Sequence, residues 1–243
     1  MNSIYPLLFE PNLHTVVWGG ERLCRWKGLP EQDNVGESWE VSAVESSPSI
    51  VANGCWAGKT LPEVVASAPE DILGKAVAKR NGGKMPLLVK FIDARKDLSI
   101  QVHPNDEMAL REHNKLGKSE MWYVLDAEPG ACIYAGFKKK LQADEYKRMV
   151  EDGTITEALA RHEAHAGDVF YIPAGRVHAI CSGILWQRFS SNRTLLTEYL
   201  TITGRGLTVS RANSILPMLL RHLTTRLSGN IGPIMLSAVT ART

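Results

Sequence analysis

The segment "GDVFYIPAGRVHAI" (residues 167–180) carries a histidine, His178, directly after a turn that contains a proline and a glycine. Its spacing is G-x5-P-x-G-x2-H. Pro173 fixes φ and Gly175 tolerates turn geometry, so the backbone can aim His178 from the next strand into an interior. Imidazole is a common metal ligand. A lone histidine is more often structural, and only this turn pattern favours a ligand.

This spacing resembles the second motif of the cupin jelly-roll superfamily, in which the matching histidine is a metal ligand. The first cupin motif usually offers two histidines separated by one residue. Here that place holds "LSIQVHPND", with Gln101 and His103. Residues two apart on a strand share a face, so both side chains can point at one ion. An amide oxygen is a weaker ligand than an imidazole, which makes Gln101 the weaker candidate.

A third candidate ligand is Glu120, at the start of the strand predicted in "GKSEMWYV". A glutamate taken alone is most often a solvated charge. Together, however, His103, Glu120 and His178 supply nitrogen and oxygen ligands and leave positions open for solvent or substrate. That composition is typical of a catalytic rather than a structural zinc site.

Six strings resemble one family closely, the zinc-dependent, type I-like mannose-6-phosphate isomerases. They are "VWGG", "GESWEVS", "PLLVKFIDA", "LSIQVHPND", "GKSEMWYVL" and "GDVFYIPAGRVHAI", spread over most of residues 5–185. The resemblance implies a mainly β cupin jelly-roll with helical insertions, and the interconversion of mannose 6-phosphate and fructose 6-phosphate. It also implies one zinc per chain, held by residues that match Gln101, His103, Glu120 and His178.

Moving a carbonyl between carbons 1 and 2 requires a proton to be taken from one carbon and returned to its neighbour. A zinc ion can polarise the oxygens, and a positioned acid or base contributes about 10²- to 10⁴-fold. Lys118, two residues before Glu120, is the candidate catalytic and substrate-binding group for a sugar oxygen or the phosphate. Glu37 is a weaker substrate-binding candidate. The alternatives are that Lys118 is a plain surface lysine and that Glu37 is a buried structural residue.

Two other functions use a similar motif. A non-catalytic cupin that binds metal and sugar is the first, and the full "QVHPND…GKSE" context argues against it. A cupin oxygenase with iron is the second, and the carboxylate and the missing H-x-H pair argue against that.

Strands that bracket a few helices position these residues. Residues 1–59 predict short strands and turns, and a helical insertion follows at about 60–82, where Thr60 and Glu63 have capping-box spacing. Further helices are predicted near 105–114 and 141–162, and a hairpin turn at 128–130. The pattern predicts a small double-sheeted β barrel.

Composition limits the partners. The chain has 243 residues, 44% of them apolar, and a net charge of +2, which gives no expectation of nucleic acid or membrane partners beside the small sugar phosphate. No apolar run approaches the roughly 20 residues of a membrane span. The start lacks the features of a signal peptide. Four well-separated cysteines suit reduced thiols in the cytoplasm. The oligomeric state is not specified.

The composition changes after Leu185. Residues 1–185 hold 13 Lys and 8 Arg against 25 acidic residues, whereas residues 186–243 hold 7 Arg, no Lys and one acidic residue. The family resemblance leads one to expect "LAEIQQ" and "YRIYDYNRPGLDG" here, the second with an arginine regarded as catalytic. We therefore divide the chain into an isomerase region, 1–185, and an aberrant tail, 186–243, and expect the barrel to lack its last strands.

The genetic code indicates the cause. When the third base of each codon from Trp186 is joined to the first two bases of the next, the shifted frame permits "AEIQQQSD", then "YRI" and "DYNRPGLDG". Our hypothesis is a frameshift just after Leu185, and resequencing of the locus tests it. The rival interpretation is a genuine basic tail, whose "LPMLLRHLTTRL" has leucines near helical spacing. With the frameshift, we expect a chain that is unstable and weakly active or inactive.

Overall fold

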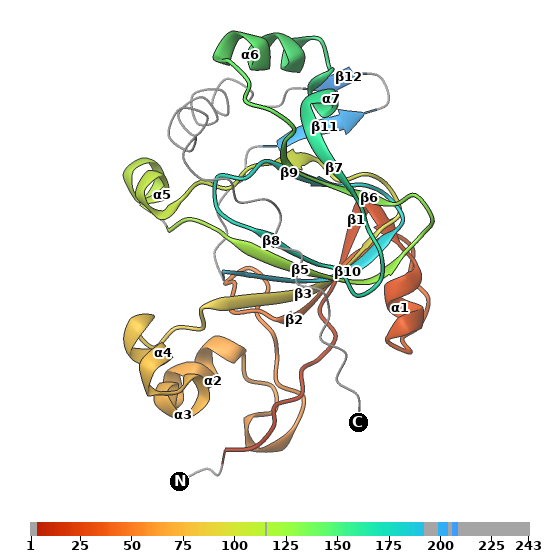
Figure 1. The fold of residues 1–243 in the computed structure, drawn as a ribbon. Helices are drawn as coiled ribbons and strands as arrows, with labels where there is room; N and C mark the ends of the chain where they lie inside the picture. Colours follow the sequence, from red (N-terminus) through yellow and green to blue (C-terminus); the bar gives the residue numbers. More distant parts are fainter. Residues whose placement is uncertain (1–3, 115, 192–198, 204–205, 209–243) are drawn as a thin grey trace, which may run out of the picture.

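A computed structural model describes residues 4–114, 116–191, 199–203 and 206–208 of the chain. Its strands form two six-stranded sheets, which lie one above the other in Figure 1. In spatial order the first sheet holds β1 (Leu13–Gly20), β2 (Val35–Val41), β3 (Leu87–Ala94), β10 (Ile184–Ser191), β5 (Glu120–Ala127) and β8 (Val169–Ile172). The second holds β12 (Gly206–Thr208), β11 (Tyr199–Thr203), β4 (Ile100–Gln101), β9 (His178–Ile180), β6 (Cys132–Phe137) and β7 (Leu159–Glu163).

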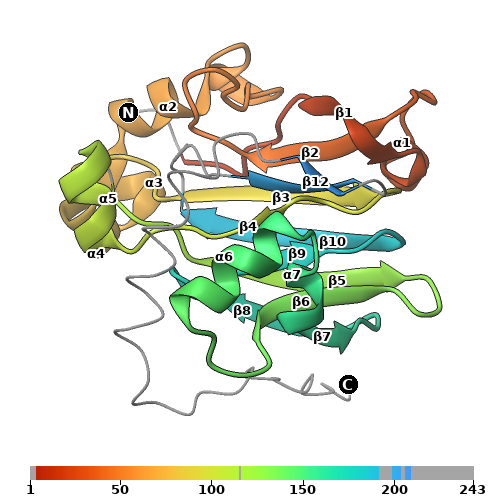
Figure 2. The same cartoon turned by 90° about the horizontal axis from the view of Figure 1, so that it is seen from above.

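The expected mainly β, double-sheeted barrel is confirmed, and its strand pairs are antiparallel. β10 is central to the first sheet because it pairs with β3 on one side and β5 on the other, as Figure 2 shows from above. The largest core cluster contains side chains from both sheets, among them Ile92, Trp122, Ile133, Ile180 and Trp186. Burial of apolar area between the sheets therefore holds the barrel together.

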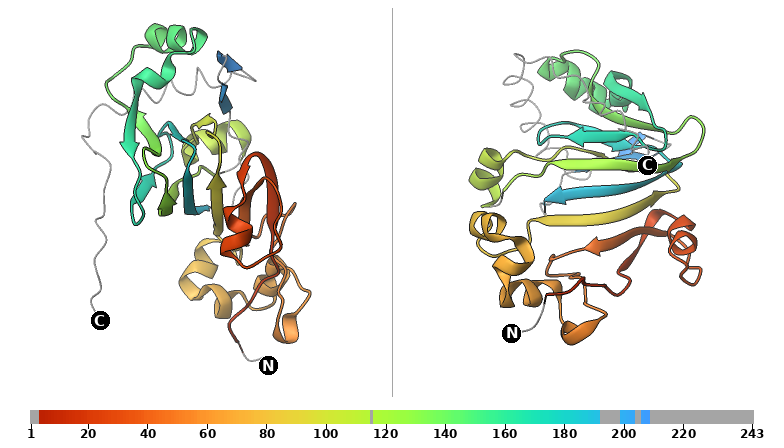
Figure 3. Two further views of the ribbon diagram at one scale, coloured as in Figure 1. Left: turned by 90° about the vertical axis from the view of Figure 1, so that its right-hand side faces the viewer. Right: turned by 60° about the horizontal axis from the view of Figure 1, so that its bottom comes forward.

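The helices lie outside the two sheets. They are α1 (Arg22–Trp26), α2 (Leu61–Ser67), α3 (Pro69–Leu73), α4 (Lys75–Arg80), α5 (Asp106–His113), α6 (Ala143–Glu151) and α7 (Ile155–Ala158), with a 3-10 turn, η1 (Gly54–Trp56). Figure 3 shows α2–α4 at one end of the molecule and α6 and α7 at the other. α2–α4 are the predicted insertion. The Thr60–Glu63 capping box is present, since the side chain of each accepts a hydrogen bond from the other's backbone N–H.

Three sequence-based expectations need correction. The helix predicted over 141–162 ends at Ala158, because the next residues pair as β7 with β6. Residues 1–59 contain a helix, α1, whose five residues are too few to show a helical period. The turn at Glu128–Gly130 does not close a hairpin, because β5 pairs with β10 and β8 whereas β6 pairs with β7 and β9. That turn carries the chain from one sheet to the other.

The chain continues as strands beyond the predicted boundary at Leu185. Ile184–Ser191 form one uninterrupted strand that pairs along its whole length with β3. Leu200 lies opposite Ile100, and Tyr199 opposite Gln101, so β11 adds to β4 in the second sheet. We expected the last strands to be missing; in the described residues β10, β11 and β12 occupy this region. Most of the tail, including "LPMLLRHLTTRL", lies outside the described residues.

No helix in the described ranges is long and apolar enough to cross a membrane.

Candidate metal centre

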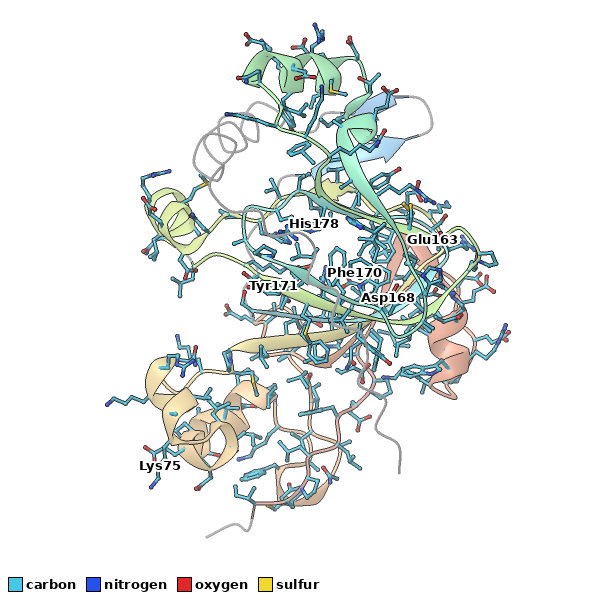
Figure 4. The ribbon with its side chains drawn as sticks, in the orientation of Figure 1. Lys75, Glu163, Asp168, Phe170, Tyr171 and His178 are labelled. Atoms are coloured by element: carbon cyan, nitrogen blue, oxygen red, sulfur yellow. The ribbon has the colours of Figure 1, made fainter. Side chains whose placement is uncertain are left out.

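The three strongest candidate ligands come together inside the barrel. His103 follows β4, Glu120 begins β5 and His178 begins β9, so the two sheets both contribute. One ligand atom from each residue lies within 4.8 Å of the others. Their exposed fractions are 2%, 1% and 3%. Figure 4 shows His178 among the side chains between β9 and β5.

Local backbone structure explains how residues distant in sequence meet. Gly175 has a φ of +84°, and its N–H donates to the carbonyl oxygen of His103 at 2.6 Å. The turn predicted from the proline and glycine is therefore hydrogen-bonded to His103, which follows β4, just before β9 begins. The Cα of His178 lies opposite that of Gln101 in the ladder. Position 175 requires a glycine, because residues with a side chain rarely adopt a positive φ.

Neighbouring groups orient each ligand. The Nδ1 of His178 lies 2.9 Å from the carbonyl oxygen of Arg176, which leaves its Nε2 for an ion. The indole Nε1 of Trp122 donates to Oε2 of Glu120 at 2.8 Å. The other carboxylate oxygen, Oε1, lies 3.2 Å from Nε2 of His103. His178 and Glu120 are therefore each held through an atom that does not face the centre.

The site fits a divalent metal. Oε1 of Glu120 is buried and faces Nε2 of His103 at 3.2 Å and Nζ of Lys118 at 3.0 Å. A buried carboxylate needs positive charge or hydrogen bonds around it, and a cation bound between Glu120 and the two imidazoles would supply positive charge. The donor set of two imidazole nitrogens and one carboxylate oxygen suits zinc and related ions. The three residues can therefore hold one metal ion.

Electrostatics keep the ligands in their binding forms. Burial, with the neighbouring His103, lowers the pKa of His178 to about 3, and burial lowers the pKa of His103 as well. Burial alone would raise the pKa of Glu120, but the charges of Arg188 and Lys118 hold it well below its usual range. At neutral pH the imidazoles are uncharged and the carboxylate is ionised, as metal ligands must be.

The candidate catalytic group, Lys118, lies at the centre. Its Nζ is 3.0 Å from Oε1 of Glu120, and its side chain is buried. Burial and the charge of Arg188 lower its pKa, although Glu120 opposes the shift. The interpretation of Lys118 as a plain surface lysine is therefore wrong.

The other substrate-binding candidate, Glu37, belongs to a neighbouring ion-pair network. Its Oε2 lies 2.8 Å from Nζ of Lys90 and accepts a hydrogen bond from Nε1 of Trp39 at 2.6 Å. Its Oε1 lies 3.9 Å from Nη2 of Arg188, whose Nη1 is 3.7 Å from Oε1 of Glu120. Arg188 thus connects the Glu37 network to the metal ligands.

Sequence reasoning missed Lys90 and Arg188. Lys90 is the one charge inside the apolar run "LLVKFI", a signal for a buried partner. Arg188 lies beyond the boundary predicted at Leu185, in the segment interpreted as the tail. Gln101 is half-buried, with its Cα opposite that of His178; its role as a fourth ligand stays a prediction.

Comparison with known proteins shows which family and which proteins the chain is similar to. Residues 7–135 match the family described as phosphomannose isomerase type I, catalytic domain. The chain is 39% identical over 181 residues to mannose-6-phosphate isomerase ManA of Bacillus subtilis, covering 74% of this chain and 56% of that protein. It is 37% identical to mannose-6-phosphate isomerase of Streptococcus mutans, covering 74% and 55%.

Solved structures of proteins with similar names share the fold of this chain. The crystal structure of the mannose 6-phosphate isomerase from Bacillus subtilis superimposes with a TM-score of 0.72 at 32% identity, covering 83% of this chain and 64% of that one. Phosphomannose isomerase variants from Salmonella typhimurium share the fold at 16% identity, with a TM-score of 0.70 for one of them. The chain spans a little over half the length of the curated relatives it matches.

Proposed function

The chain belongs to the type I phosphomannose isomerase family, and we propose that it binds one zinc ion through His103, Glu120 and His178 and interconverts mannose 6-phosphate and fructose 6-phosphate. The observation that carries the proposal is the convergence of these three ligand atoms within 4.8 Å. The curated relatives carry this activity in their names. Gln101 is the proposed fourth ligand.

When bound, the metal supplies a Lewis acid for the carbonyl and hydroxyl oxygens at carbons 1 and 2. The residues of the chain do the rest. His103, Glu120 and His178 hold a site from which bulk water is excluded by burial. Exclusion of water strengthens each electrostatic interaction with the substrate.

Lys118 is the proposed proton donor or phosphate partner. Its lowered pKa makes its ammonium a better acid near neutral pH than a surface lysine. It can donate to a sugar oxygen while a proton passes between carbons 1 and 2, or pair with the phosphate. Glu37, held by Lys90 and Trp39, is the proposed substrate-binding group further along the interior. We further propose a cytoplasmic location, in keeping with four free cysteines.

The division of the chain at Leu185 is also part of the proposal. We propose that residues 1–185 are the isomerase region and that the printed reading frame changes after Leu185. The arginine that the family carries later in the chain then falls outside the printed frame. The printed chain is therefore expected to bind metal through its own ligands but to turn over slowly.

The test compares four proteins: the printed chain, its frame-restored version, and a His178→Ala variant of each. Fructose 6-phosphate formed from mannose 6-phosphate is measured in a coupled assay, with glucose 6-phosphate as a control substrate and zinc per chain measured in parallel. We expect zinc in both parent chains, faster turnover after restoration, and loss of both with His178→Ala. Zinc without turnover in the restored chain would refute the isomerase and favour a metal- and sugar-binding cupin. Equal turnover in the two parent chains would refute the expected impairment of the printed chain, whereas resequencing of the locus tests the frameshift itself.

A further inference from the structure

Arg188 is a buried cation wedged between two carboxylates. Its exposed fraction is 9%, and its guanidinium lies 3.7 Å from Glu120 and 3.9 Å from Glu37. Both distances exceed a hydrogen bond, and its buried Nε has no hydrogen-bond partner among the described residues. The guanidinium therefore acts on the metal ligand chiefly through its charge.

The backbone fixes Arg188 in this place. Its Cα lies opposite Lys90 on one side and opposite Trp122 on the other, so it sits in the middle of the first sheet. Along β10 the buried positions alternate, and Arg188 lies between the buried Trp186 and Ser190 on the inner face. Because successive side chains of a strand point to opposite faces, the register that fixes Arg188 in the sheet also directs its side chain into the barrel.

The positively charged side chains around the centre already outnumber the carboxylates. In the described part of the site, Glu37 and Glu120 face three cations, namely Lys90, Lys118 and Arg188. A divalent ion at Glu120 adds two more positive charges in a site where screening by water is weak. The fixed charge of Arg188 thus stabilises the metal-free carboxylate and repels the ion.

We propose that Arg188 is an internal counter-ion of Glu120 that weakens divalent-cation binding at His103, Glu120 and His178. The inference rests on the metal site of the proposed function and adds a residue that sets its affinity. The frame-restored sequence places isoleucine at position 188, an apolar, β-branched residue that suits a buried central strand. Arg188→Ile therefore removes the charge with a residue that this position is expected to accept.

The experiment measures zinc affinity of the full chain by competition with a chromogenic chelator, and reads site occupancy separately from the visible absorption of bound Co²⁺. Arg188→Ile is compared with Arg188→Lys, which keeps the charge. Arg161→Ile is the matched control, since Arg161 is an exposed strand arginine on β7 whose contact is the carbonyl of Gly130. We expect Arg188→Ile to bind zinc at least about tenfold more tightly. The other two variants should stay within about threefold of the parent.

Unchanged or weaker zinc binding by a folded Arg188→Ile variant overturns the inference. Arg188→Met, closer in volume, replaces it should the isoleucine variant not fold. Arg188→Lys is a second test, because a change of zinc affinity beyond about threefold despite the retained charge also overturns the inference. The His178→Ala variant distinguishes failure of the metal site from failure of the counter-ion proposal. Zinc binding that does not depend on His178 refutes the metal site, whereas His178-dependent binding that ignores Arg188 refutes only the counter-ion.

Discussion

The buried pair of Glu37 and Lys90 yields a prediction for stability that requires no metal. Glu37→Gln removes one negative charge but keeps the shape and an oxygen that accepts from Nε1 of Trp39. The variant leaves Lys90 buried beside Arg188 with no carboxylate at 2.8 Å. Truncating one partner of a buried ion pair is strongly destabilising because the other charge stays behind.

The magnitude follows from the pKa of Glu37. Burial alone would raise it, but Lys90 and Arg188 lower it from 4.5 to about 2. A folded-state pKa below the unfolded value stabilises the protein above pH 4.5, and this stabilisation is lost as the pH falls towards 2. The difference corresponds to about 3 kcal/mol. Burial and Arg188 lower the pKa of Lys90 to about 7, so Lys90 itself becomes neutral above that pH.

The effect of Glu37→Gln should therefore peak between about pH 5 and 7. We expect a loss of about 3 kcal/mol at pH 6, measured by urea unfolding with a chelator present to remove metal. The loss should shrink below pH 4, because the carboxylate of the unfolded parent takes up a proton there and that of the folded parent does so as the pH approaches 2. It should also shrink above pH 8, where Lys90 no longer carries charge. Glu163→Gln, an exposed glutamate on β7, is the control and should change stability by less than about 0.5 kcal/mol. A loss below about 1 kcal/mol at pH 6, or one equally large at pH 3, would contradict the reasoning.

Three further predictions concern single side chains. His178→Ala should reduce bound zinc to background and lower turnover of the frame-restored chain by at least about 10³-fold, seen by metal analysis and the coupled assay; retained zinc would exclude it as a ligand. Lys118→Met should lower kcat by about 10²- to 10⁴-fold while zinc content stays at parent level, and an effect on KM alone would assign Lys118 to phosphate binding. Thr60→Ala should lower the free energy of unfolding by about 1 kcal/mol through loss of the helix cap, and an unchanged urea midpoint would contradict this.

The clustering of His103, Glu120 and His178 could be predicted from sequence because the strings around them resemble a known motif, while their role as metal ligands stays a prediction. The Pro173–Gly175 turn fixes the approach to His178, and Glu120 starts a strand with clear alternation. The ion-pair network could not be predicted in the same way. Lys90 lies opposite Arg188 only through the register of β3 and β10, almost a hundred residues apart in the chain. Register between distant strands depends on packing of the whole sheet, which no local pattern specifies.

The fold errors have the same origin. Leu159–Glu163 has no strand alternation strong enough to be seen alone, and becomes β7 by pairing with the edge of β6. The Glu128–Gly130 turn looks like a hairpin in sequence, because a tight turn between two strands does not reveal whether the strands pair or cross to opposite sheets. Tertiary pairing outweighs local preference in both places.

The inner face of β10 bears on the reading frame. Three consecutive inward side chains past Leu185 each bury a polar atom without a hydrogen-bond partner in the described structure: Nε1 of Trp186, Nε of Arg188 and Oγ of Ser190. Each such atom costs about 1–3 kcal/mol, and native proteins carry only a few. The restored frame would place alanine, isoleucine and glutamine at these positions, two of which have no polar side-chain atom. Because the ladder to β3 and β5 is made by backbone groups, either frame can form the strand. Backbone pairing therefore does not distinguish the frames, whereas the unpartnered polar atoms inside the barrel favour the restored one.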